Sequence, residues 1–90
     1  MATNYRQLER RVKGFANHRR IEILFLLRTK PELSVDEICQ HVHVGYKTGA
    51  AHVTKLAAAG LILKRNEGQT VRHKLSDRGQ AVLTFLPQLQ

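Results

Sequence analysis

The residues best suited to chemistry in this chain are cations spaced to hold phosphate groups. Two β-rich runs, residues 61–65 and 70–75, flank the turn-forming stretch 66–69 and together predict a β-hairpin. Ammonium and guanidinium groups bind phosphate oxygens, so a basic ribbon of this kind can contact a nucleic-acid backbone or the adjacent minor groove. The cations expected on it are Lys64, Arg65, Arg72 and Lys74.

The second run of the hairpin has an alternating pattern. Because successive side chains of a strand point to opposite faces, Arg72 and Lys74 should face solvent while Val71 and His73 face inward. Charged residues also keep an exposed edge strand from pairing with another chain, so these cations could serve as edge protection. The two roles are compatible, and we favour phosphate contact.

A further set of candidates lies on a predicted helix over residues 46–59, directly before the hairpin. If Gly49, Val53 and Leu56 face the interior, the polar and small residues between them face outward. No Arg, Asn or Gln occurs in this helix, which predicts modest direct reading of bases; the alternative is an ordinary solvated helix face. The groove candidates are Tyr46, Lys47 and Thr48 in the first turn, with Ala51 allowing close approach and Lys55 placed for a phosphate.

The elements that position these residues can be located from capping signals. Ser34 and Glu37 form a Ser-x-x-Glu capping box that opens a short helix through about residue 42. Gly45 allows a sharp turn into the next helix, and Gly60 supplies a left-handed end to it. Residues 34–60 therefore predict a helix, a tight turn and a second helix, and residues 61–75 predict a basic hairpin. This is the arrangement of a winged helix-turn-helix.

Three further helices complete the prediction. One runs over about residues 4–13, from a cap at Asn4 that Gln7 could extend into a capping box, and stops at Gly14. A second, residues 18–28, is capped by Asn17 and apolar nearly all round, so it should be central. Ser76 caps a last helix over about residues 77–89, with a kink or end near Leu86 because of Pro87. The outer helices carry apolar stripes: Tyr5, Leu8 and Val12, and Val82, Phe85, Leu86 and Leu89.

Length and charge limit the interpretation. Ninety residues make one mainly α-helical domain, residues 1–90, in the order α-α-α-α-β-β-α, with a thin core that favours a partner subunit over the two stripes. The net charge is +8, with +5 in residues 45–75 and −3 in residues 32–44. Such a chain favours a polyanion such as double-stranded DNA, although charge alone could serve solubility.

Several other classes of function find little support. The only cysteine, Cys39, lies near His41 and His43, but the spacing gives no tetrahedral metal site, and Cys39 is better explained by core packing. His52 fits a half-buried, hydrogen-bonded histidine better than a phosphate contact. No phosphate loop, nucleophile elbow or paired-carboxylate motif occurs, so we expect neither catalysis nor a cofactor. No membrane span or signal peptide is evident, and we expect a cytoplasmic, nucleoid-associated protein.

One stretch carries a family resemblance. Residues 16–27, Ala-Asn-His-Arg-Arg-Ile-Glu-Ile-Leu-Phe-Leu-Leu, closely resemble the second-helix signature of ArsR-type winged-helix repressors. The resemblance implies a homodimer held by its first and last helices, with one recognition helix of each protomer in successive major grooves. Residues 33–38 look like the start of the family's next helix, residues 52–56 and 59–62 are similar to its following run, and residues 76–79 are closer to a motif of MarR-like relatives.

The chain also departs from that family. Ser34, Val35 and Asp36 stand where metal-sensing members carry Cys-Val-Cys, and Asp77 alone represents the ligands of the alternative site on the last helix. The resemblance therefore does not extend to a metal. Gly49 replaces a valine of the family, which costs a helix about 0.5–1 kcal/mol relative to alanine.

These observations predict a homodimeric transcriptional regulator that binds specific duplex DNA through the recognition helix (residues 46–59) and the wing (the hairpin of residues 61–75). One alternative is an architectural protein that coats DNA without sequence choice, which the scarcity of base-reading residues would suit. Another is a winged helix used for protein–protein contact. The alanine-rich face of the recognition helix supports this alternative: Ala50, Ala51, Ala57, Ala58 and Ala59.

Overall fold

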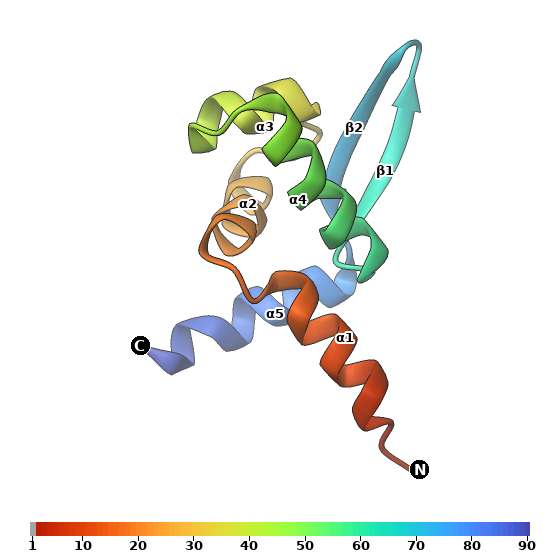
Figure 1. Cartoon of the computed structure of the whole chain (residues 1–90), viewed down its shortest axis with the longest axis vertical. Coiled ribbons are helices and arrows are strands. Elements are labelled where there is room, and N and C mark those ends of the chain that lie inside the picture. The colour runs from red at the N-terminus through yellow and green to blue at the C-terminus, as the bar shows by residue number, and fades with distance from the viewer. Residues whose placement is uncertain (1) are drawn as a thin grey trace.

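The computed structural model describes residues 2–90 and contains a helical body with one antiparallel hairpin projecting from it (Figure 1). The fold is the winged helix-turn-helix predicted from the sequence. The elements are α1 (Tyr5–Phe15), α2 (His18–Thr29), α3 (Val35–Val42), α4 (Tyr46–Ala58), β1 (Ile62–Glu67), β2 (Thr70–Leu75), α5 (Asp77–Phe85) and the 3₁₀ helix η1 (Leu86–Leu89).

Side-chain caps start four of the five α-helices where the sequence predicts them. The Asn17 side chain accepts hydrogen bonds from two backbone N–H groups of α2, and the Ser76 side chain accepts one from the Gly79 N–H of α5. The capping box of α3 is complete, because Ser34 Oγ accepts from the Glu37 N–H and Glu37 Oε1 accepts from the Ser34 N–H. Asn4 caps α1.

Two details of α1 differ from the prediction. No hydrogen bond returns from the Gln7 side chain within residues 2–90, so only half of the expected capping box forms. The helix also continues past Gly14 to Phe15, whose ring is buried in the core. Burial of this ring stabilises the additional residue of helix.

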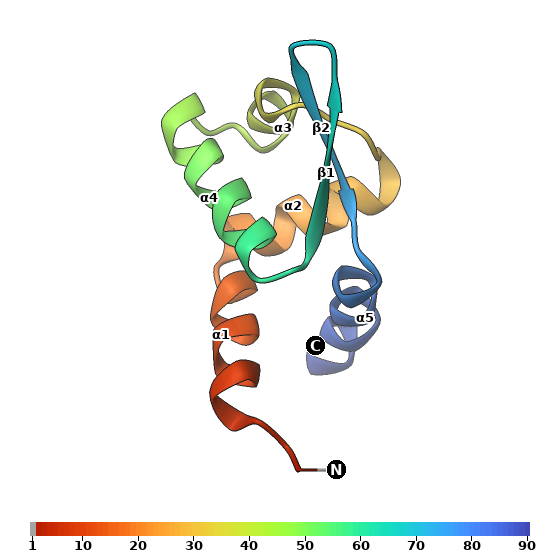
Figure 2. The ribbon, with the colours of Figure 1, turned by 90° about the vertical axis from the view of Figure 1, so that its right-hand side faces the viewer.

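The core lies around α2. Ile23, Leu24 and Leu27 of this helix are at most 1% exposed, which agrees with its apolar sequence. Buried residues from α3, α4, β1 and α5 surround them. In both views, the free ends of α1 and α5 project from the end of the molecule opposite to the hairpin tip (Figures 1 and 2).

In the turn between α3 and α4, the left-handed residue is not the glycine that the sequence suggested. His43 adopts the left-handed conformation, with φ 58°, while Gly45 has φ −69° and caps α4. Histidine is one of the residues that tolerate this conformation. The expected left-handed Gly60 after α4 is confirmed, with φ 75°.

The hairpin is longer and its turn tighter than predicted. Strand β1 continues to Glu67, and the register from Ile62↔Leu75 to Glu67↔Thr70 leaves a two-residue turn in place of the expected stretch 66–69. Gly68, at φ 60°, permits this turn. The other edge of β2 is covered by the segment before α3, through a bridge between Leu33 and His73.

The C-terminal end of the chain follows the prediction made from Pro87. Helix α5 ends at Phe85, and Leu86–Leu89 continue as a single 3₁₀ turn. Among the helices of residues 2–90, none has the length and apolar character required to cross a bilayer.

Candidate nucleic-acid interface

The second helix of the helix-turn-helix, α4, presents one polar face to solvent. Gly49, Val53 and Leu56 are buried, as the sequence predicts. Tyr46 in the first turn is 60% exposed. The remaining outward residues, Lys47, Thr48, Ala51 and Lys55, are exposed as well.

The N-terminus of α4 differs from those of the other α-helices in the described chain. Its cap is Gly45, which makes no side-chain hydrogen bond, whereas α1, α2, α3 and α5 all have one. The first backbone N–H groups of a helix have no partner within it, and the helix dipole adds positive character there. This end of α4 can therefore receive phosphate oxygens beside Tyr46 and Lys47.

Gly49 fixes how closely α4 approaches α3. A Cβ atom at this position would overlap Cys39 Sγ and lie 3.2 Å from Val44 Cγ2. The Cys39 thiol is buried and points toward the Gly45 carbonyl oxygen at 3.7 Å. The glycine that lowers the helix propensity of α4 is therefore required by its packing. The expectation that Cys39 belongs to the core is confirmed.

The strand register separates the four predicted cations of the wing. Arg65 and Arg72 are cross-strand partners and share one face with Lys74, whereas Lys64 is paired with His73 on the opposite face. They therefore do not line a single face of the ribbon. On that face, His73 is only 1% exposed, whereas its cross-strand partner Lys64 is exposed to solvent.

Two of these cations, Arg65 and Arg72, form ion pairs with carboxylates, and the sequence did not predict these pairs. Arg72 Nη1 donates to Glu37 Oε1 at 2.9 Å, and Arg65 Nη2 lies 3.1 Å from Glu32 Oε2 and 2.8 Å from Glu67 Oε2. Arg72 is half-buried as a result, although it was expected to face solvent. Val71, expected to face inward, is 37% exposed because the hairpin extends past the body at that point.

Three side chains of these ion pairs have shifted pKa values: Glu37, Arg65 and Glu67. Hydrogen bonds from Arg65 hold the pKa of the Glu67 carboxyl below its ordinary value, and the same contacts raise the pKa of Arg65. The pKa of Glu37 is lowered, chiefly by the backbone N–H of Ser34 and secondarily by the Ser34 hydroxyl, with Arg72 contributing less. These groups are all charged at neutral pH.

His52 connects α4 to α2. Its Nδ1 lies 3.2 Å from Nη1 of Arg20, and Arg20 also donates to the Lys13 carbonyl oxygen at 3.4 Å. Because arginine is always a donor, Nδ1 of His52 is the acceptor. Burial, followed by the charge of Arg20, lowers the pKa of His52. The predicted half-buried, hydrogen-bonded histidine is confirmed.

Large apolar side chains remain uncovered on α1 and at the C-terminal end. Tyr5 is 79% exposed, Leu8 48% and Val12 49%, and Phe85 and Leu89 are exposed to a similar degree. Val82 and Leu86, also expected in an interface, are partly buried against the core of their own chain. Within residues 2–90, no three His, Cys, Asp or Glu side chains come together as metal ligands.

Solved structures show what the chain is similar to. HlyU from Vibrio cholerae is 32% identical, with a TM-score of 0.82 over 99% of this chain and 97% of that protein. Mb0332 from Mycobacterium bovis, a possible ArsR-family transcriptional regulator solved as a homodimeric winged helix-turn-helix DNA-binding domain, is 29% identical, with a TM-score of 0.80 over 99% and 88% of the two chains. This chain belongs to the ArsR family of winged helix-turn-helix regulators.

Two further comparisons agree with this assignment. NolR from Sinorhizobium fredii gives a TM-score of 0.84 at 26% identity, over 94% of this chain and 85% of that one. The transcriptional activator HlyU of Vibrio cholerae serotype O1 is 37% identical over 65 residues, which are 72% of this chain. That match spans only 59% of the length of the curated relative. No protein-family profile matches the chain.

Proposed function

We propose that this chain is a transcriptional regulator that binds specific sequences of duplex DNA as a homodimer. The observation that carries the proposal is the exposed first turn of α4. There Tyr46, Lys47 and Thr48 lie beside backbone N–H groups that no side chain of residues 2–90 caps. A recognition helix that enters the major groove by its N-terminal end needs this combination of reachable side chains and phosphate-binding N–H groups.

The remaining contacts follow from the fold. Ala51 lets the backbone of α4 approach the bases, and Lys55 meets a phosphate farther along the groove. Lys64 and Lys74 extend from the wing toward the adjacent backbone, and Arg65 and Arg72 join them when phosphate oxygens replace their carboxylate partners. This exchange is favourable because exposed ion pairs contribute little in water.

A homodimer is supported by the apolar residues on the outer helices. Tyr5, Leu8 and Val12 on α1, with Phe85 and Leu89 near the C-terminus, are exposed. Figure 2 shows α1 and the C-terminal end of the chain away from the wing tip. Contact between two copies there, completed by Val82 and Leu86, would present both copies of α4 to one duplex. Mb0332 is itself described as a homodimer. Action on duplex DNA would place the protein in the cytoplasm, at the nucleoid.

A second function, coating DNA without sequence choice, is favoured by one observation. The outward face of α4 offers Lys47 and Thr48 but no Arg, Asn or Gln for bidentate contacts to bases. Specificity would then depend on few direct contacts and on the shape of the duplex.

Fluorescence anisotropy separates these functions. The full chain is titrated with a random-sequence duplex library and with one generic duplex, from low to physiological salt. Selection of a subset of sequences that persists at physiological salt supports the specific regulator. Equal binding to every sequence, lost as salt rises, supports the architectural role. Absence of binding at low salt would overturn both and leave protein–protein contact.

A further inference from the structure

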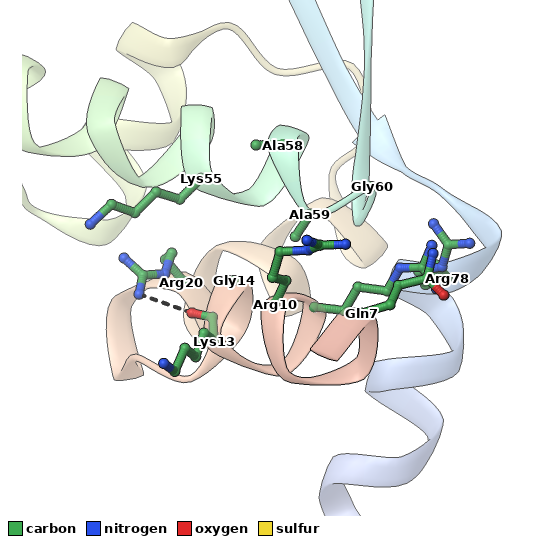
Figure 3. Close-up of a pocket in the computed structure, with 11 residues that line it drawn as sticks. Gln7, Arg10, Lys13, Gly14, Arg20, Lys55, Ala58, Ala59, Gly60 and Arg78 are labelled. Carbon is green, nitrogen blue, oxygen red and sulfur yellow. Dashed lines mark hydrogen bonds between the residues drawn. The ribbon is translucent and has the colours of Figure 1, made fainter. Parts of the chain in front are cut away.

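A concave basic surface lies between α1 and the C-terminal end of α4 (Figure 3). We call it the basic hollow. Its volume is about 590 Å³, within the range of small-molecule sites. Six of its eleven lining residues are arginine or lysine and none is acidic: Arg10, Arg11, Lys13, Arg20, Lys55 and Arg78.

Small residues form the floor of the basic hollow. Gly14 of α1 meets Ala59 so closely that a Cβ atom on the glycine would overlap the alanine methyl group. Beside them, the Arg78 guanidinium lies over Gly60, where an added Cβ would be 2.7 Å from Nη1. The helices approach closely at these points, while the long cationic side chains rise around them (Figure 3). A ligand can therefore reach several cations at once.

Within the described part of the chain, most of these cations have no partner of opposite charge. Lys13 pairs with the exposed Glu9 at 3.2 Å, and Arg20 is bonded to a backbone carbonyl and to His52. Within residues 2–90, no ion pair or hydrogen bond is made by the side chains of Arg10, Arg11, Lys55 and Arg78. Like charges gathered on a concave surface repel one another and raise the local concentration of anions.

The basic hollow is separate from the apolar stripe of α1. Gln7, Arg10 and Gly14 recur at three- and four-residue spacing along one row of the helix, while Leu8 and Val12 lie on another, facing nearly the opposite way. A partner subunit that covers Leu8 and Val12 therefore leaves this row open, while Arg11, three positions after Leu8, lies between the row and the stripe.

We propose that the basic hollow binds a small phosphorylated anion. Guanidinium groups match phosphate oxygens in bidentate fashion, which suits a lining rich in arginine. The cations lie toward two ends, with Lys55, Arg20 and Lys13 at one and Arg78 at the other (Figure 3), so a ligand with more than one phosphate group fits best. Lys55 also lies on the outward face of α4. On the proposed function, an occupied hollow therefore lowers affinity for the duplex.

The test uses the full chain without DNA, so it does not depend on the proposed function. Isothermal titration calorimetry at physiological salt measures binding of sodium triphosphate and of inorganic phosphate. It is carried out on the wild type, on the double variant Arg10→Gln/Arg78→Gln and on the control Arg6→Gln. Arg6 is exposed on the same helix but does not line the hollow. We expect triphosphate to bind more tightly than phosphate, and the double variant to bind it at least tenfold more weakly than Arg6→Gln.

Three outcomes would overturn the site. Wild-type protein could fail to bind triphosphate at millimolar concentration, or both variants could weaken it equally, which would indicate a general charge effect. Thirdly, the double variant could bind triphosphate as the wild type does and yet bind a generic duplex more weakly in a separate anisotropy titration, which would make the hollow a contact for the DNA backbone. Because Arg10 and Arg78 are exposed, both variants should keep the wild-type circular dichroism spectrum and melting temperature.

Discussion

Arg72 Nη1 donates a hydrogen bond to Glu37 Oε1 at 2.9 Å, which joins the second strand of the wing to the first turn of α3. The same carboxylate completes the capping box of α3 by accepting from the Ser34 N–H. One oxygen atom therefore takes part in the start of a helix and in the placement of a wing cation. Electrostatically, Glu37 competes with any phosphate for Arg72.

The substitution Glu37→Gln tests this competition. The amide oxygen that it introduces would keep the capping-box acceptor, while the charge beside Arg72 would be removed. We expect the free energy of unfolding to change by less than about 0.5 kcal/mol, since both side chains remain partly exposed and such ion pairs contribute little. Affinity for a generic duplex should rise. Asp36→Asn, the same charge change on an exposed neighbour, is the control. Equal gains in both variants would show that only net charge matters.

Removing Arg72 and Lys74 together examines the wing. If both side chains contact phosphates, Arg72→Ala/Lys74→Ala weakens binding to all sequences alike and lowers the slope of log affinity against log salt by about two. Anisotropy titrations at several salt concentrations measure this slope. Arg6→Ala, on α1, should leave it nearly unchanged. An unaltered affinity in the double variant would remove the wing from the mechanism.

Filling the space at Gly49 should destabilise the protein. Alanine raises helix propensity by about 1 kcal/mol, but its methyl group overlaps Cys39 Sγ, and overpacking costs about 1–3 kcal/mol. We expect a net loss for Gly49→Ala in urea denaturation. Combining it with Cys39→Ala, which vacates the sulfur position, should restore part of the loss relative to Cys39→Ala alone. A simple sum of the two single effects would contradict the contact.

Polar substitutions on α1 address the dimer. Leu8→Ser/Val12→Ser should shift the protein to monomer in sedimentation equilibrium and weaken binding to a two-half-site duplex more than to a single half-site. The fold should persist, because both side chains are about half exposed and lie outside the core. Arg6→Ser changes the same helix away from the stripe and should remain dimeric. A dimer that survives the double substitution would place the interface elsewhere.

The pH dependence of stability should contain a contribution from His52. Its pKa is lowered in the folded protein, so below the ordinary value of 6.5 the unfolded chain takes up a proton that the folded chain does not. The stability contributed by neutral His52 is therefore present above pH 6.5 and is lost as pH falls below that value. Urea denaturation at about pH 7.5 and about pH 5.5 should show a smaller pH effect in His52→Gln than in the wild type. His41→Gln, at an exposed histidine of α3 that does not contribute to this shift, should behave as the wild type.

Much of the fold could be predicted because its signals are local. Asn17, Ser34 and Ser76 mark helix starts through hydrogen bonds to residues two or three positions ahead, and Gly60 marks an end through its own backbone angle. The outward face of α4 followed from periodicity alone. Every one of these features depends on neighbours along the chain.

What could not be predicted depends on contacts between distant segments. Glu37 and Arg72 are 35 residues apart, and only the packing of α3 beside the hairpin brings them together. The cations of the basic hollow come from α1, α2, α4 and α5, so no single stretch of sequence contains them. The packing role of Gly49 could not be predicted either. Its low helix propensity can be read from the sequence, whereas its contact with Cys39 depends on how α3 and α4 pack.

The contact between Gly14 and Ala59 has a consequence for the geometry of a DNA site. It fixes the distance between α1, which would carry the dimer contact, and α4, which would enter the groove. In a two-fold symmetric dimer this distance sets the spacing between the two half-sites of a palindrome. A relative with the same α4 but a larger residue at position 14 would then read the same bases at a different separation, so operator length could evolve independently of operator sequence.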